Sequence, residues 1–171
     1  MIHPEMIREI LSSYSLDVMG IHGISHWGRV LENGIKLAGN TGANPKIVTL
    51  FAVFHDSRRA NDSHDPGHGE RGSKLVEAFR ENYLSLSDKE FERLQYACEK
   101  HTDGMIDEDV DVQTCWDADR LDLWRVGITP RANFLSPNAQ DESIYAWAKE
   151  RSLSGYTPEC VSKWLKSTTN H

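Results

Sequence analysis

The segment Phe51-Ala52-Val53-Phe54-His55-Asp56 places a histidine beside a carboxylate at the end of an apolar run. A neutral imidazole and an ionised carboxylate together suit a borderline divalent metal. Burying such a pair is costly unless another group compensates its charge. Because a single His-Asp dipeptide has little specificity, its interpretation as a metal site depends on ligands from other parts of the chain.

Further candidate ligands lie on both sides of this pair. Upstream, His26 lies in the segment Ser25-His26-Trp27-Gly28-Arg29-Val30. Downstream are His101 and the acidic run Asp117-Ala118-Asp119-Arg120-Leu121-Asp122. Together with the His-Asp pair they give the order H…HD…H…D over most of the chain.

Capping residues mark the starts of several helices. Asn44-Pro45 and Thr157-Pro158 each place a capping residue before a proline at the first helical position. Ser87-Asp88-Lys89-Glu90 has the pattern of a capping box. Apolar residues recur at helical spacing, and no segment alternates with a period of two between hairpin turns. We therefore predict an all-α fold with helices near residues 4–13, 24–39, 45–56, 67–83, 87–101, 112–126, 141–152 and 157–167.

Length and composition exclude several classes of protein. The 171 residues suffice for one domain with a hydrophobic core, and we expect residues 1–171 to form it, with helices 141–167 packed on the rest. The net charge of −7 argues against general nucleic-acid binding. Three scattered cysteines indicate no disulfide framework. We see no signal peptide and no apolar stretch long enough for a membrane span, so we expect a cytoplasmic protein.

The predicted helices place the candidate ligands at defined positions. His26 falls at the start of the second helix, and His55 and Asp56 close the third. Asp119 lies between Trp116 and Leu123, whose side chains we expect to face the core, so this carboxylate needs a partner: an arginine, a helix cap or a metal. Two imidazoles and two carboxylates suit Mn, Fe, Co, Ni or Zn better than Mg, which prefers oxygen ligands.

These motifs resemble the HD superfamily of metal-dependent phosphohydrolases over residues 20–126. The family's His-x-x-Arg-Val segment is matched by His26-Trp27-Gly28-Arg29-Val30, and its doublet by His55-Asp56. Its Ala-Asp-Arg-Leu segment is present as Ala118-Asp119-Arg120-Leu121. The resemblance implies a single helical HD-type domain in which His26, His55, Asp56 and Asp119 bind the metal.

Two more histidines extend the resemblance. His68-Gly69-Glu70-Arg71-Gly72 is similar to the family's His-x-x-x-Gly/Ser segment, and His101 is similar to the histidine that follows it. Some family branches use these positions for a second metal or for the substrate phosphate. The ligand order also resembles that of the di-iron branch that includes inositol oxygenase. We therefore expect one or two metals, and a catalytic or metal-binding role for His68 and His101.

Other polar residues near the motifs leave alternatives open. Arg58 and Arg59 could bind a phosphate by bidentate hydrogen bonds, or could be solvated loop charges. His22 could replace His26, but it lacks the Arg-Val partner, and we expect it at a helix start or on the surface. Asp117 and Asp122 flank Asp119, and we expect them to balance the charge of Arg120 or Arg125.

The expected activity is hydrolysis of a small phosphorylated metabolite, with a nucleotide as the first candidate and with phosphomonoester and phosphodiester both open. A metal would polarise a phosphoryl oxygen and lower the pKa of a coordinated water. His68 or His101 could donate a proton to the leaving oxygen. The alternatives are a di-iron oxygenase of the same fold and a metal-binding domain that senses a nucleotide without turnover. Substrate identity and oligomeric state stay open.

Overall fold

Helix α3 (Pro45–Phe54) forms the centre of the molecule. The Asn44 side chain caps it by accepting a hydrogen bond from the Lys46 N–H, and Pro45 occupies its first turn. Seven of its ten residues are buried, on every side of the helix. An apolar helix of this kind requires neighbours all around it. Helices α2 (Ile24–Thr41), α4 (His68–Tyr83), α5 (Asp88–Lys100) and α6 (Val110–Arg120) supply them.

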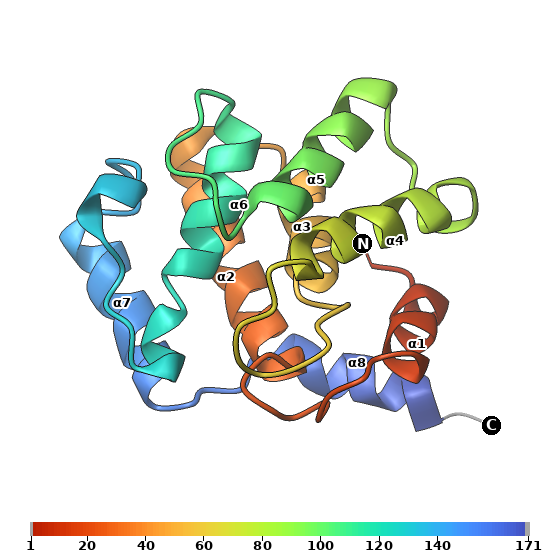
Figure 1. The fold of residues 1–171 in the computed structure, drawn as a ribbon. Coiled ribbons are helices and arrows are strands. Elements are labelled where there is room, and N and C mark those ends of the chain that lie inside the picture. The colour runs from red at the N-terminus through yellow and green to blue at the C-terminus, as the bar shows by residue number, and fades with distance from the viewer. Residues whose placement is uncertain (1, 170–171) are drawn as a thin grey trace.

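The computed structural model describes residues 2–169, with side chains up to residue 166. The described residues form helices and turns and no strand, which confirms the all-α prediction. Figure 1 shows α2, α5 and α6 arranged around α3. The elements are α1 (Pro4–Ser12), α2 (Ile24–Thr41), α3, α4 (His68–Tyr83), α5 (Asp88–Lys100), α6 (Val110–Arg120), the short 3₁₀ helices η1 (Leu123–Val126) and η2 (Ala132–Phe134), α7 (Glu142–Leu153) and α8 (Glu159–Thr169).

Close packing of α4 brings three helix ends together. A Cβ atom at Gly72 would lie 2.8 Å from the Phe54 carbonyl oxygen, and one at Gly69 would lie 2.6 Å from the Glu99 carbonyl oxygen. Only glycine allows such an approach of one backbone to another. The first turn of α4 therefore fits between the C-terminal ends of α3 and α5.

The predicted helix 112–126 is shorter than expected. Helix α6 ends at Arg120, and the chain tightens into i→i+3 hydrogen bonds, such as that from the Asp122 N–H to the Asp119 carbonyl oxygen. The apolar periodicity continues into η1, so the sequence pattern does not reveal the break. Gly127, with a φ of 76°, ends η1 in the left-handed conformation that glycine adopts without strain.

The terminal helices cover one side of this arrangement. Helix α8 packs against α1 and α2, whereas α7 packs against α2 and η1. Figure 1 shows α1 and α8 next to each other at the lower right, away from α5 and α6. Within residues 2–169, none of the helices has both the length and the apolar character needed to cross a bilayer.

Candidate metal centre

Four of the predicted ligands meet where three helices begin or end. His26 lies in the first turn of α2, His55 and Asp56 directly follow α3, and Asp119 lies in the last turn of α6. The Nε2 atoms of His26 and His55 are 3.0 Å apart. Asp119 Oδ1 lies 3.4 Å from His26 Nε2 and 3.6 Å from His55 Nε2. Asp56 Oδ2 lies 3.5 Å and 3.9 Å from the same two atoms.

These distances fit the ligands of one divalent ion. Ligand atoms bonded to a metal at about 2.0–2.2 Å are about 3–3.5 Å from one another in tetrahedral or octahedral geometry. His26, His55 and Asp56 are buried, and the Asp119 side chain is 14% exposed. We call these four side chains the first ligand set.

The hydrogen bonds of the Nδ1 atoms fix the tautomers in this set. His26 Nδ1 lies 2.8 Å from Asp122 Oδ2, and His55 Nδ1 lies 3.1 Å from the Phe51 carbonyl oxygen. A carboxylate and a carbonyl only accept hydrogen bonds, so both Nδ1 atoms donate. In the neutral imidazoles both Nε2 atoms then carry lone pairs. Two lone pairs at 3.0 Å repel each other, and a cation between them removes that repulsion.

His68 and His101 repeat this arrangement on the other side of Asp56. His68 Nδ1 lies 2.5 Å from the Asp65 carbonyl oxygen, and His101 Nδ1 lies 2.7 Å from the Cys98 carbonyl oxygen. Their Nε2 atoms face each other at 2.8 Å. Asp56 Oδ1 lies 3.2 Å from His68 Nε2 and 3.7 Å from His101 Nε2. We call His68, His101 and Asp56 the second ligand set.

Asp56 belongs to both ligand sets, with one carboxylate oxygen facing each. Oδ2 faces His26 and His55, whereas Oδ1 faces His68 and His101. Both groups of three, His26–His55–Asp56 and Asp56–His68–His101, have the spacing of a metal site. The residues present therefore fit two metal ions that share one carboxylate.

The protonation states also suit metal binding. Burial would raise the pKa of Asp56, but its histidine neighbours, His55 first, hold it well below its usual range. The pKa of Asp119 is lowered in the same way, against the effect of burial, by His55. Burial lowers the pKa of His26, and burial together with His101 lowers the pKa of His68 to about 4. Ionised carboxylates and neutral imidazoles are the ligand forms that a metal requires.

A buried ion pair supports His26 from behind. The Arg29 Nε donates to Asp122 Oδ1 at 2.7 Å, and its Nη2 donates to Asp122 Oδ2 at 3.0 Å. Arg29 Nη1 also donates to the Tyr156 carbonyl oxygen at 2.8 Å. A hydrogen-bonded carboxylate behind a ligating histidine orients the ring and raises its basicity. Asp122 therefore balances chiefly the charge of Arg29, and not that of Arg120 or Arg125 as expected, although Arg125 Nε lies 3.8 Å from Asp122 Oδ2. It also fixes the ring of His26.

The other flanking residues have different partners. Asp117 Oδ1 accepts hydrogen bonds from Gln113 Nε2 at 2.8 Å and from the Ser136 N–H at 3.1 Å. Arg120 donates to the carbonyl oxygens of Gly104, Met105 and Phe134. These bonds attach residues 104–105, before α6, and residues 134–136, after η1, to α6, a role that the sequence pattern did not indicate.

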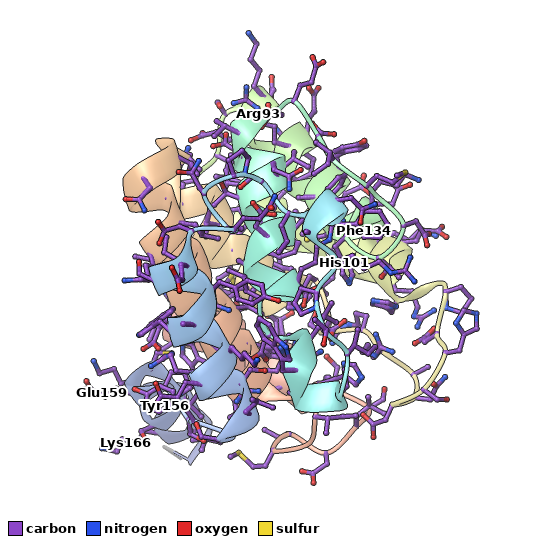
Figure 2. The ribbon with its side chains drawn as sticks, turned by 90° about the vertical axis from the view of Figure 1, so that its left-hand side faces the viewer. Arg93, His101, Phe134, Tyr156, Glu159 and Lys166 are labelled. Atoms are coloured by element: carbon purple, nitrogen blue, oxygen red, sulfur yellow. The ribbon has the colours of Figure 1, made fainter. Side chains whose placement is uncertain are left out.

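A cavity of about 480 Å³ opens above the two ligand sets. Its lining includes Asp56, His68, His101 and Asp119, together with apolar and basic side chains between Leu123 and Phe134. Figure 2 shows the labelled His101 and Phe134 close together on the right-hand side of the molecule. A volume of this size is typical of small-molecule sites.

His22 is a site residue that sequence reasoning missed. We expected it at a helix start or on the surface, but it is buried and lines the cavity. Its Nδ1 lies 2.9 Å from Asp56 Oδ2. His22 lies in the turn before α2, so no helical spacing or motif relates it to His26.

The two consecutive arginines point to different places. Arg59 is buried, lines the cavity and has its Nη1 3.4 Å from Asp56 Oδ1. Arg58 donates to the carbonyl oxygen of Ile10 and to Ser13 Oγ at the end of α1. The structure therefore brings Arg59, and not Arg58, to the candidate site. Arg125, on the opposite side of Asp56, also lines the cavity.

Comparisons with models of protein families, with curated proteins and with solved structures gave no match. The helical fold and the buried His/Asp cluster are compatible with an HD-type domain.

Proposed function

We propose that this chain is an HD-type metal-dependent phosphohydrolase that acts on a small phosphorylated metabolite, with a nucleotide as the first candidate. The observation that carries the proposal is the pair of ligand sets sharing Asp56 on the floor of a cavity. Mixed imidazole and carboxylate ligands favour Mn, Fe, Co, Ni or Zn. Two metals held in this way would polarise phosphoryl oxygens and lower the pKa of a coordinated water.

The residues of the site fall into two groups, one that would hold the metals and one that would bind the substrate. His26, His55, Asp56 and Asp119 would hold one metal, and His68 and His101 with Asp56 a second. The Nε2 atoms of His68 and His101 face each other and Asp56 Oδ1, which favours metal binding over a separate proton-donor role. Arg59 is placed to bind a phosphoryl oxygen.

A substrate screen on metal-loaded protein tests this function. The protein would be stripped with a chelator, reloaded separately with Mn, Co, Ni and Zn, and offered a panel of phosphomonoesters and phosphodiesters. We expect phosphate release that requires metal and disappears in Asp56→Ala. Metal-loaded protein that binds a nucleotide without releasing phosphate would support a sensor instead. Protein without activity and without metal affinity would refute the proposal.

The six-ligand set also favours a second candidate, a di-iron oxygenase. Its order along the chain matches the resemblance to that branch, and both ligand sets accept iron. Anaerobic loading with iron followed by exposure to oxygen separates the two functions. An oxygenase requires both iron and oxygen, whereas a phosphohydrolase works with manganese in the absence of oxygen.

A further inference from the structure

Two guanidinium groups approach Asp56 from opposite sides. Arg59 Nη1 lies 3.4 Å from Asp56 Oδ1, and Arg125 Nη2 lies 4.0 Å from Asp56 Oδ2. Both line the cavity, and their side chains are 9% and 7% exposed. Each carboxylate oxygen therefore has one ligand set and one arginine beside it.

The backbone holds both guanidinium groups in place. Arg125 Nε donates to the Ile21 carbonyl oxygen at 2.8 Å, and its Nη1 donates to the Asp122 carbonyl oxygen at 3.0 Å. Arg59 Nε donates to the Asn61 carbonyl oxygen at 3.3 Å, and its Nη2 donates to the Ser63 carbonyl oxygen at 2.8 Å. In each case the remaining nitrogen faces the metal centre. Arg59 Nη1 lies 3.2 Å from His68 Nε2, and Arg125 Nη2 lies 3.3 Å from His22 Nδ1. Fixing a side chain before binding reduces the entropy that binding costs.

Neutralising Asp56 does not explain this arrangement. Charge-assisted hydrogen bonds to a carboxylate are about 2.7–2.9 Å long, and both arginines lie farther away. His22 Nδ1, at 2.9 Å, already satisfies Oδ2. With neutral histidines, the carboxylates of Asp56 and Asp119 balance Arg59 and Arg125. Two divalent ions would then add positive charge to these groups, which favours an anion with more than one charge.

We propose that Arg59 and Arg125 clamp a terminal phosphate dianion between them, so that the substrates are phosphomonoesters and not phosphodiesters. The inference rests on the proposed function. A terminal phosphate has three unsubstituted oxygens, one for the metals and one for each arginine. It carries two charges near neutral pH. A diester has one charge and two such oxygens, so metal binding would leave a buried guanidinium without a partner. Buried unpaired charge is unfavourable, and this discriminates against the diester.

The test compares a phosphomonoester and a phosphodiester with the same leaving group, para-nitrophenyl phosphate and bis-para-nitrophenyl phosphate. The variants are Arg125→Gln and Arg59→Gln. Arg58→Gln is the matched control, because it removes the neighbouring guanidinium, which lies outside the cavity. Binding of inorganic phosphate is measured by calorimetry, together with metal content and thermal unfolding of each variant.

We expect the wild type to prefer the monoester, and each variant to lose about tenfold to a hundredfold in monoester kcat/KM and in phosphate affinity. Arg58→Gln should keep the wild-type kcat/KM for the monoester and the wild-type phosphate affinity. A wild type that prefers the diester, or an Arg125→Gln variant with unchanged phosphate affinity, overturns the clamp and leaves the proposed function standing. If Arg125→Gln loses its metals, the phosphate affinity of Arg59→Gln is used instead, and an unchanged value overturns the clamp. A metal-loaded wild type that hydrolyses neither ester nor any other phosphate ester instead refutes the proposed function.

Discussion

Each candidate metal ligand among the histidines is fixed through its Nδ1 atom. His26 donates to a carboxylate, and His55, His68 and His101 donate to backbone carbonyls. His55 and His101 bond to carbonyl oxygens in the last turns of the helices that they follow. The helix ends thus determine which ring nitrogen is left for the metal.

The shared carboxylate predicts different metal counts for two variants. Asp56→Ala removes a ligand from both sets, so we expect it to lose both metals, whereas His68→Ala should lose only the second. The count is measured by elemental analysis after reconstitution and dialysis. His3→Ala is the control, because this residue is exposed before α1 and lies outside the cavity. An Asp56→Ala protein that retains one tightly bound metal would contradict the role of this carboxylate as a ligand in both sets.

Lower pH should release the second metal before the first. Burial lowers the pKa of His101, but the hydrogen bond with Asp56 and the charges of Asp119 and Asp56 together outweigh it, and the net pKa is raised. Below that raised pKa a proton on His101 occupies the position that the second metal needs. The affinity for the second metal therefore falls about tenfold per pH unit. The lowered pKa of His26 delays such competition in the first set. Metal content measured after dialysis between about pH 8 and about pH 5 should fall in two steps; simultaneous loss of both metals would contradict this order.

The sequence predicts the site residues that lie in local motifs, but not those that only tertiary packing brings to the site. His26, His55, Asp56 and Asp119 lie in short segments with a recognisable order, and the structure brings them together. His22 reaches the site through the turn before α2, which no spacing reveals. Likewise, the direction in which a loop arginine points depends on the backbone of the loop. The sequence therefore could not indicate which of Arg58 and Arg59 reaches the cavity.

At the scale of elements, the site depends on how closely α4 approaches its neighbours. Gly72→Ala would place a Cβ atom 2.8 Å from the Phe54 carbonyl oxygen and 3.1 Å from that of His55. Backbone must move to relieve this contact, so we expect a destabilisation of about 1–3 kcal/mol and weaker binding of the second metal. Urea denaturation and metal analysis measure the two effects.

Gly39→Ala is the matched control for this helix substitution. A Cβ atom at Gly39, on α2, would have no neighbour within 4 Å. Alanine in such a helical position stabilises by about 0.5–1 kcal/mol. A Gly72→Ala protein as stable as Gly39→Ala would show that α4 can shift without strain.

Helix existence followed from the sequence more directly than helix ends did. The Asn44 cap, the Ser87 capping box and the apolar spacing of α3 lie where the pattern predicted them. The end of α6 did not follow, because Asp122 leaves the helix to contact His26 and Arg29. Both partners lie about a hundred positions away in the sequence, beyond the reach of local propensity.

Across the whole molecule, metals would link α2, α3, α4, α5 and α6 at one point. A ligand that binds only the folded state stabilises it by about 2.7 kcal/mol at a hundred times its Kd. We therefore expect a chelator to lower the melting temperature measured by circular dichroism, and re-addition of Mn or Zn to restore it. Asp56→Ala should melt at the same temperature with and without metal. An equal metal response in wild type and Asp56→Ala would place the bound ions elsewhere.

The hydrogen bond from Arg29 to Tyr156 has a consequence for biosynthesis. Tyr156 lies just before α8, and Figure 2 shows it near Glu159, the first residue of α8. Until a ribosome has made residue 156, Arg29 lacks this hydrogen bond, and the ring of His26 is less firmly held. A nascent chain would therefore bind metal loosely, and the choice among competing ions would be made by the finished protein.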